Sequence, residues 1–203
     1  MKYEITNKKK RVNGLTLYRI KALVELGVVK AGDLGGWIER ESNLSHEGDA
    51  WVANDAKVFG NARVSGNARV YGHALVYGHA LVYGDARVSG NVLVYENVLV
   101  YGKAKVAGNA KVYGDSVVYG DAKVFGDAWV YGNAWVSGDA QVSGKAWVYG
   151  DAEVVGNARV SGDAEVFGNA QVYGDAEVSG NAQVYGDAEV SGDAKVSGND
   201  LVG

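Results

Sequence analysis

Three histidines are the side chains of this sequence best suited to acid–base chemistry, because histidine titrates close to neutral pH. His73 and His79 lie six residues apart, and each takes a position that asparagine or aspartate holds in neighbouring segments. Six residues of strand and turn place them roughly 15 Å or more apart at about 3.3 Å per residue. Within one chain they cannot act on the same atom, so we interpret both as turn residues in a left-handed conformation. His46, at the boundary before the repeat, is a still weaker candidate for a catalytic base. We therefore expect no catalytic residue.

Other reactive or ligand-binding motifs fail on composition or spacing. The chain has no cysteine, which excludes a disulfide framework, a cysteine metal site and a thiol nucleophile. The glycine-rich segment 32–36 lacks the Gly-Lys-Ser/Thr ending of a phosphate-binding loop. Gly-Asp and Gly-Asn pairs recur every six residues, whereas calcium-binding coils use a nonapeptide repeat with a doubled glycine. We therefore expect no metal and no cofactor.

The elements that would position any site come from a six-residue repeat. A valine stands at every sixth position from Val52 to Val202, twenty-six times in succession. The unit reads Gly-(Asn/Asp)-Ala-x-Val-(Tyr/Ser/Phe), as in residues 132–137. The alternation in Ala-x-Val-Tyr is typical of a short strand, which turns Ala and Val to one face and x and the aromatic residue to the other. The Gly-(Asn/Asp) pair tolerates left-handed backbone angles and predicts a corner.

The outward residues indicate three hexads in each coil. Sampling every twelfth residue mixes serine with tyrosine, whereas one column sampled every eighteenth residue is aromatic throughout: Phe59, Tyr77, Tyr95, Tyr113, Tyr131, Tyr149, Phe167 and Tyr185. The expected fold is all-β, a single-stranded triangular β-solenoid with 18 residues per coil and about eight to nine coils. Identical columns would stack at roughly 4.8 Å, with alanine and valine in the core.

Residues 1–48 lack the hexad and predict a small β-rich cap before the repeat domain of residues 49–203. Tyr3–Thr6 and Leu15–Leu23 have the composition of strands around a polar turn, Asn7–Gly14. The turn carries the basic run 8–11, which we interpret as a solvated loop rather than a nucleic-acid or targeting segment. Without a cap, the first coil would expose unpaired strand edges.

The repeat resembles that of the hexapeptide-repeat proteins, and the residues before it narrow the likeness. The segments 29–39, 43–45 and 48–52 are similar to the entry segment of the YdcK-like β-solenoid proteins, which occur in bacteria and their phages. The resemblance implies a left-handed parallel β-helix. It also implies an alternative activity, an acyltransferase that uses acyl-coenzyme A with His73 or His79 as the general base. Enzymes of that superfamily tend to carry loop excursions around the substrate, and this repeat has none.

Two adjoining faces of the predicted prism carry apolar residues in both outward columns over their first two-thirds. The members are Leu75, Tyr77, Leu81, Tyr83, Leu93, Tyr95, Leu99, Tyr101, Tyr113, Val117, Tyr119, Trp129, Tyr131, Trp135, Trp147 and Tyr149. Farther along the chain the positions that precede each valine turn polar, as at Glu153 and Glu165. An apolar area of this extent exceeds what a monomeric protein usually exposes. We therefore expect self-association, as a parallel homotrimer built on the corner between the two faces.

Charge and hydropathy exclude two classes of partner. The net charge of −4 argues against a general nucleic-acid binder, and no segment approaches the roughly 18 apolar residues of a membrane span. The remaining face carries a mostly basic column with aspartates alongside, and we expect it to be solvated. We expect a cytoplasmic protein, or one assembled into a phage particle.

Three functions of different class remain open. We favour a non-enzymatic structural rod that self-associates through its apolar faces. The alternatives are the acyltransferase and a glycan-binding module in which Trp129, Trp135, Trp147 and the tyrosine column stack on sugar rings. In the last coil Asp200 takes an inward alanine position. The unpaired strand edges of this last coil predict that rods stack end to end, or that a second protein docks there.

Overall fold

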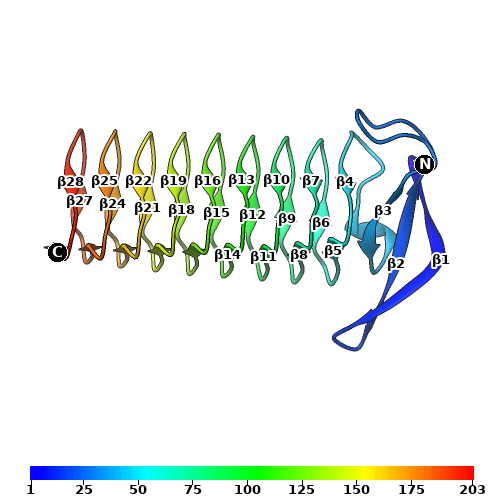
Figure 1. Ribbon diagram of the computed structural model, residues 1–203, viewed down its shortest axis with the longest axis horizontal. Coiled ribbons are helices and arrows are strands. Elements are labelled where there is room, and N and C mark those ends of the chain that lie inside the picture. The colour runs from blue at the N-terminus through cyan, green and yellow to red at the C-terminus, as the bar shows by residue number, and fades with distance from the viewer.

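The hexad folds as the sequence predicts, into a two-residue strand and a corner, and the chain winds into a long β-solenoid (Figure 1). The computed structural model describes residues 1–203. About nine coils stack along one axis. Each strand pairs in parallel with the strand 18 residues later, as Val88 does with Val106. The left-handed sense of the winding stays a prediction.

Three sheets form the faces of the prism, which we call faces one, two and three in the order in which the chain visits them. Face one contains β4 (Trp51–Val52), β7 (Arg69–Val70), β10 (Arg87–Val88), β13 (Lys105–Val106), β16 (Lys123–Val124), β19 (Gln141–Val142), β22 (Arg159–Val160), β25 (Glu177–Val178) and β28 (Lys195–Val196). Face two contains β5 (Lys57–Val58), β8 (Leu75–Val76), β11 (Leu93–Val94), β14 (Lys111–Val112), β17 (Trp129–Val130), β20 (Trp147–Val148), β23 (Glu165–Val166), β26 (Gln183–Val184) and β29 (Leu201–Val202). Face three contains β6 (Arg63–Val64), β9 (Leu81–Val82), β12 (Leu99–Val100), β15 (Val117–Val118), β18 (Trp135–Val136), β21 (Glu153–Val154), β24 (Gln171–Val172) and β27 (Glu189–Val190).

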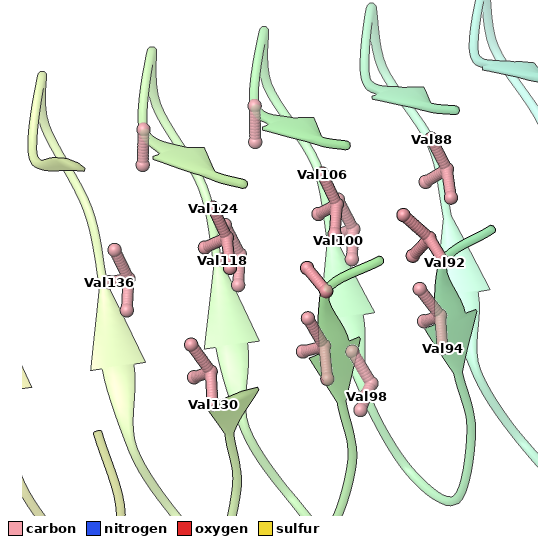
Figure 2. Packing of buried hydrophobic residues seen from close by; sticks show 14 of the residues in the cluster. Val88, Val92, Val94, Val98, Val100, Val106, Val118, Val124, Val130 and Val136 are labelled. Carbon is pink, nitrogen blue, oxygen red and sulfur yellow. The ribbon is translucent and has the colours of Figure 1, made fainter. Parts of the chain in front are cut away.

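Valine and alanine fill the interior of the coils. Every repeat valine from Val52 to Val184 is fully buried, and Figure 2 shows the valines of successive coils in rows inside the solenoid. Val92 and Val98 replace the smaller alanine in one coil and are also fully buried. Ser116 is the one buried serine in an alanine position, and its hydroxyl donates to the backbone oxygen of Tyr113 at 3.0 Å. The core therefore holds no uncompensated polar side chain.

Glycine supplies the left-handed residue of nearly every corner, with Asn54 and Glu96 as the exceptions, which corrects the prediction for the residue after it. Gly132 has a φ of 72°, and a Cβ there would lie 2.9 Å from the backbone nitrogen of Gly150 in the next coil. None of the residues after the repeat glycines has a positive φ, His73 and His79 included. The steric demand thus falls on the position where the backbones of successive coils approach most closely.

The Asn and Asp side chains after the glycines form ladders along the corners instead. Asn133 Nδ2 donates to Asp151 Oδ1 at 2.8 Å. The same bond joins other amide and carboxylate pairs one coil apart: Asn67–Asp85, Asn97–Asp115, Asn109–Asp127, Asn157–Asp175 and Asn169–Asp187. An amide next to a carboxylate avoids the repulsion between two carboxylates stacked in register.

The cap extends the sheet of face two toward the N-terminus. β1 (Tyr3–Val12) pairs antiparallel with β2 (Leu15–Ala22), β2 with β3 (Leu34–Ile38), and β3 pairs in parallel with β5. The single short helix, η1 (Glu41–Asn43), follows β3, and no helix of the structure has the length and hydrophobicity to cross a membrane. The cap covers the first coil so well that Trp51, in the outward column, is only 3% exposed.

The hairpin turn is shorter than the sequence analysis predicts. Asn13 and Gly14 form it, with φ values of 50° and 82°, so the basic residues 8–11 lie within β1, and residues 9–11 pair with β2. The predicted loop over Asn7–Gly14 is therefore wrong. Asn-Gly is itself a strong two-residue hairpin turn, so the strand continues to the residue before it despite its polar sequence.

Candidate functional site

The most extended feature of the outer surface is a column of stacked aromatic rings on face two. Its members are Phe59, Tyr77, Tyr95, Tyr113, Tyr131, Tyr149, Phe167 and Tyr185, one ring in each coil. Neighbouring ring centroids are 4.9 to 5.5 Å apart, and neighbouring planes lie 1° to 16° from parallel. Parallel in-register strands cause this stacking, because equivalent side chains lie one strand spacing apart.

A second, shorter column stands on face three. Tyr83, Tyr101 and Tyr119 stack with centroid separations of 4.9 and 5.1 Å. In the next coil Trp135 meets Tyr119 edge to face, at 6.4 Å and 85°. The two adjacent faces thus carry parallel aromatic columns over the same coils.

Apolar residues also fill the outward column that precedes each valine. On face two, Trp129 and Trp147 stack at 5.2 Å, following Leu75 and Leu93 in the same row of paired strands. Lys111 interrupts this row, but its ammonium group lies 4.1 Å from the ring centroid of Trp129. A cation on an aromatic face is partly satisfied there, so the row remains compatible with an apolar surface.

All sixteen residues predicted to form an interface lie on faces two and three. Most of them are half-buried, because each side chain covers its neighbours in the coils before and after it. Trp135 and Trp147 are the most accessible, with 46% and 38% of their surface exposed. Whether these faces bind a partner stays a prediction.

Stacking changes the ionisation of the tyrosines. Burial, followed by the charges of Tyr113, Tyr77 and Glu96, raises the pKa of Tyr95 to about 12. Burial, the charge of Glu165 and a hydrogen bond with its carboxylate raise the pKa of Tyr149 to about 12. The phenols of Tyr95 and Tyr149 are therefore neutral over the physiological pH range.

Beyond Trp147 the outward positions that precede each valine on faces two and three become polar, except at Leu201, whereas aromatic residues still follow the valines as far as Tyr185. The polar members are Glu153, Glu165, Gln171, Gln183 and Glu189. The hydroxyl of Tyr149 donates to Glu165 at 3.2 Å, and that of Tyr173 to Glu189 at 3.1 Å. The apolar surface therefore ends in acidic coils.

His73 and His79 do not form a shared site. His79 Nε2 lies 2.9 Å from Asn61 Nδ2, on a corner between faces two and three. His73, with a side chain 69% exposed, lies on the preceding corner with its Nδ1 3.7 Å from Asp55 Oδ2. Each histidine continues the polar ladder of its own corner. The structure also holds no group of three or more His, Asp or Glu side chains that could bind a metal ion.

His46, which gives the weakest signal in the sequence, joins three parts of the cap. Its ring stacks on Tyr3 at 4.3 Å, its Nδ1 accepts from the backbone nitrogen of Lys2 at 3.3 Å, and its Nε2 lies 2.6 Å from Glu41. It borders an open depression of about 720 Å³ that also includes Arg63. Both ring nitrogens are engaged in contacts that hold the cap together. No sequence pattern links residues 2 and 46, so only the structure could reveal this role.

Asp55 anchors the cap to the first coils, and the sequence analysis missed it. Its carboxylate accepts hydrogen bonds from Lys10 at 3.0 Å, Lys57 at 3.2 Å and the Trp37 indole at 2.8 Å. Partial burial alone would raise the pKa of Asp55, but these donors and the charge of Lys57 hold it well below its usual range. The carboxylate thus binds β1, β3 and β5 together.

We expect Asp55→Ala to loosen the cap. Hydrogen bonds to a charged group contribute about 1.5 to 3 kcal/mol each, so losing this set should destabilise the cap by about 2 kcal/mol or more. Hydrogen exchange of residues 3–22 should rise markedly while exchange beyond residue 100 stays constant. Asp151→Ala, on an exposed corner, serves as the matched control. Equal exchange in the two variants would contradict the anchoring role.

Face one has the polar character expected from the sequence. Its basic column passes through paired strands at Arg69, Arg87 and Lys105, and Glu177 bridges Arg159 at 4.0 Å and Lys195 at 3.2 Å. Exposed ion pairs of this kind contribute little to stability. The apolar columns of faces two and three are therefore the main candidate for a functional surface.

Comparison with known families confirms the kind of repeat. The family described as YdcK Beta solenoid repeat matches residues 56–72, 62–78, 68–84, 86–102, 128–144 and 170–186. The matches extend over both the apolar and the acidic coils. No curated protein matches the chain.

Proposed function

We propose that this chain, a YdcK-like β-solenoid repeat protein, is a non-enzymatic structural rod that self-associates through faces two and three. The observation that carries the proposal is the concentration of outward Leu, Val and Trp residues in the same coils of these two faces, beside the stacked tyrosines. Outside these coils, the only Leu, Val or Trp residues at outward positions of the repeat are Trp51, which the cap covers, Val155 and Leu201. We call the sixteen interface candidates on faces two and three the apolar strip. A rigid rod that carries such a strip has the properties of an assembly subunit.

The arrangement of charges around the strip supports this proposal. Arg63 precedes it on face three, and Glu153 and Glu165 follow it on faces three and two. Protein interfaces commonly have such an apolar centre and a charged rim. Trp135 and Trp147, the most exposed members of the strip, are of the residue type that contributes most to binding energy.

Stacking within one chain explains only part of the pattern. Aromatic ladders stabilise neighbouring coils whether or not a partner is present. Ring stacking therefore explains the tyrosine columns. It does not explain Leu75, Leu81 or Val117, because mostly polar residues occupy the equivalent positions in the C-terminal coils. A partner that covers the strip provides that reason.

The double variant Tyr131→Asp with Trp135→Asp tests the proposal. Each aspartate would be buried in the interface without a partner, at a cost of several kcal/mol. We expect the dissociation constant, measured by sedimentation equilibrium, to rise at least about a hundredfold.

Ser143→Asp with Ser161→Asp adds the same two charges on face one and should leave association unchanged. Circular dichroism should show that both variants keep the parent fold. A parent protein that sediments as a 21.4 kDa monomer at micromolar concentration would refute the self-association proposal.

A glycan-binding module is the second candidate, and the exposure of Trp135 and Trp147 favours it. Flat indole rings stack well on sugar rings. This function requires a monomer with open faces and predicts quenching of tryptophan fluorescence by polysaccharide. The sedimentation experiment therefore separates the two candidates.

A further inference from the structure

The charges of the chain are divided unequally along the rod. Residues 1–126, up to the midpoint of the repeat domain, contain 17 Lys and Arg and 12 Asp and Glu, a net charge of +5. Residues 127–203 contain 3 and 12, a net charge of −9. The rod therefore has a basic end with the cap and an acidic end with the last coils, and its apolar strip lies between them.

The cap places exposed cations in line with face two. β1 and β2 belong to the same sheet as β5, β8 and β11, and in Figure 1 the hairpin projects beyond the edge of the rod where those strands lie. Lys8, Lys9 and Arg11 are exposed on this hairpin, and none of them has a carboxylate within 4.0 Å, whereas Lys10 is held by Asp55. Lys9 lies over the Tyr18 ring, on the side of the sheet that Ile38 and Val58 share, so these cations act on a molecule along face two through their electric field and not by direct contact.

The acidic end of face two offers the complementary charges. Glu165 follows Trp147 in its outward column, and Asp151, Asp163 and Asp187 lie on the corners that flank the face. Most of these carboxylates accept only from neutral side chains, such as Asn133 at 2.8 Å or the Tyr149 hydroxyl at 3.2 Å. Their charge therefore remains available to a cationic partner.

We propose that face two pairs with face two of a second copy in antiparallel orientation, so that the basic hairpin of each copy lies over the acidic coils of the other. The inference rests on the proposed self-association and specifies the partner and direction of its face-two contact. Antiparallel copies join apolar strip to apolar strip and place the +5 half of each beside the −9 half of the other. A parallel arrangement, as in the trimer that the sequence analysis predicts, would place −9 beside −9 and oppose association.

A charge-reversal variant distinguishes the two orientations by the direction of its effect. Glu153→Lys with Glu165→Lys takes the net charge of residues 127–203 from −9 to −5 and so weakens the attraction in an antiparallel pair. We expect a rise of at least about tenfold in the dissociation constant at low salt, shrinking as salt screens the charges. In a parallel assembly the same variant relieves repulsion and association strengthens. Tighter association would therefore overturn the inference while leaving the proposed function in place.

Lys8→Glu, Lys9→Glu and Arg11→Glu, made without the first two changes, take the net charge of residues 1–126 from +5 to −1. This hairpin variant should likewise weaken an antiparallel pair, whereas in a parallel assembly it would relieve the repulsion between two basic halves. Fluorescence transfer gives an independent readout, since the chain has no native cysteine to interfere. Energy transfer should be more efficient from a donor on Lys9→Cys of one copy to an acceptor on Glu165→Cys of a second copy than to an acceptor on Lys9→Cys of that second copy. The reverse order of efficiencies would contradict the antiparallel pair. A parent protein that stays monomeric would instead refute the proposed function itself.

Discussion

Replacing Val130 by aspartate is expected to unfold the middle of the solenoid. Val130 is fully buried and pairs with Val112 and Val148 in the coils on either side. The surrounding core is valine and alanine, which cannot donate a hydrogen bond to a carboxylate. A buried charge without a partner costs several kcal/mol, which is a large fraction of the stability of a domain of this size.

The Val130→Asp substitution should unfold the coils around residue 130 and leave the coils on either side folded, instead of destabilising all coils equally. Each coil contacts only the coils before and after it, so stability is nearly a sum over neighbouring coils. We expect urea unfolding, followed by circular dichroism, to lose its single transition. Hydrogen exchange should rise first in the coils around residue 130.

Trp129→Asp is the matched control, because the same charge lies one residue away on the outward face of the same strand. It removes the stack with Trp147, worth about 1 kcal/mol, and leaves the core intact. The comparison is made at a concentration where both proteins are monomeric. Equal loss of stability in the two variants would show that the inward and outward assignment is wrong.

The regular part of the fold could be predicted because one rule repeats in every coil. A period of six residues fixes which side chains face inward, and a period of 18 fixes which ones stack. The aromatic column from Phe59 to Tyr185 follows directly, since parallel in-register pairing brings identical positions together. The same two periods suffice to place the sixteen interface candidates on two faces. The degree of burial of these residues does not follow from the periods, because it depends on how the rings cover one another.

The cap could not be derived in this way because it has no repeat. The Asp55 carboxylate meets Lys10, which is 45 residues away in the chain, and His46 meets the backbone of Lys2, 44 residues away. Each contact depends on how β1 to β3 fold back on the first coil, and no spacing in the sequence encodes that. The hairpin prediction is wrong for a different reason. Residues 8–11 have the polar composition of a loop, but the Asn-Gly signal that follows them determines where the turn forms.

The corner shows where a composition rule is too coarse. Glycine and Asn or Asp both tolerate a positive φ, so the sequence predicts that either can occupy the left-handed position. The backbone of the next coil passes close to the first of the two, and glycine leaves the most room for it. Asn54 and Glu96 are the exceptions, with φ values of 56° and 64° at glycine positions, and the Glu96 carboxylate accepts from the backbone nitrogen of Gly114 at 2.7 Å.

The solenoid is expected to lose stability steeply above pH 10. An unfolded tyrosine ionises near pH 10, whereas in the folded protein burial, followed by neighbouring charges, raises the pKa of Tyr95 and Tyr149 to about 12. Burial likewise raises the pKa of Tyr77, Tyr113 and Tyr131. A group whose pKa is raised on folding stabilises the protein fully below its unfolded pKa, and that contribution is lost as the pH rises through the folded value.

Several tyrosines contribute with the same sign, so the loss between pH 10 and about 12 should be cooperative along the column. Tyrosinate absorbance should rise together with the loss of the β-sheet circular dichroism signal. In Tyr95→Phe with Tyr149→Phe, stacking is kept and two ionisable hydroxyls are removed, so the fall in stability above pH 10 should become shallower. If that double variant has the same pH dependence as the parent, ionisation of the stacked phenols is not what limits the stability of the rod at high pH.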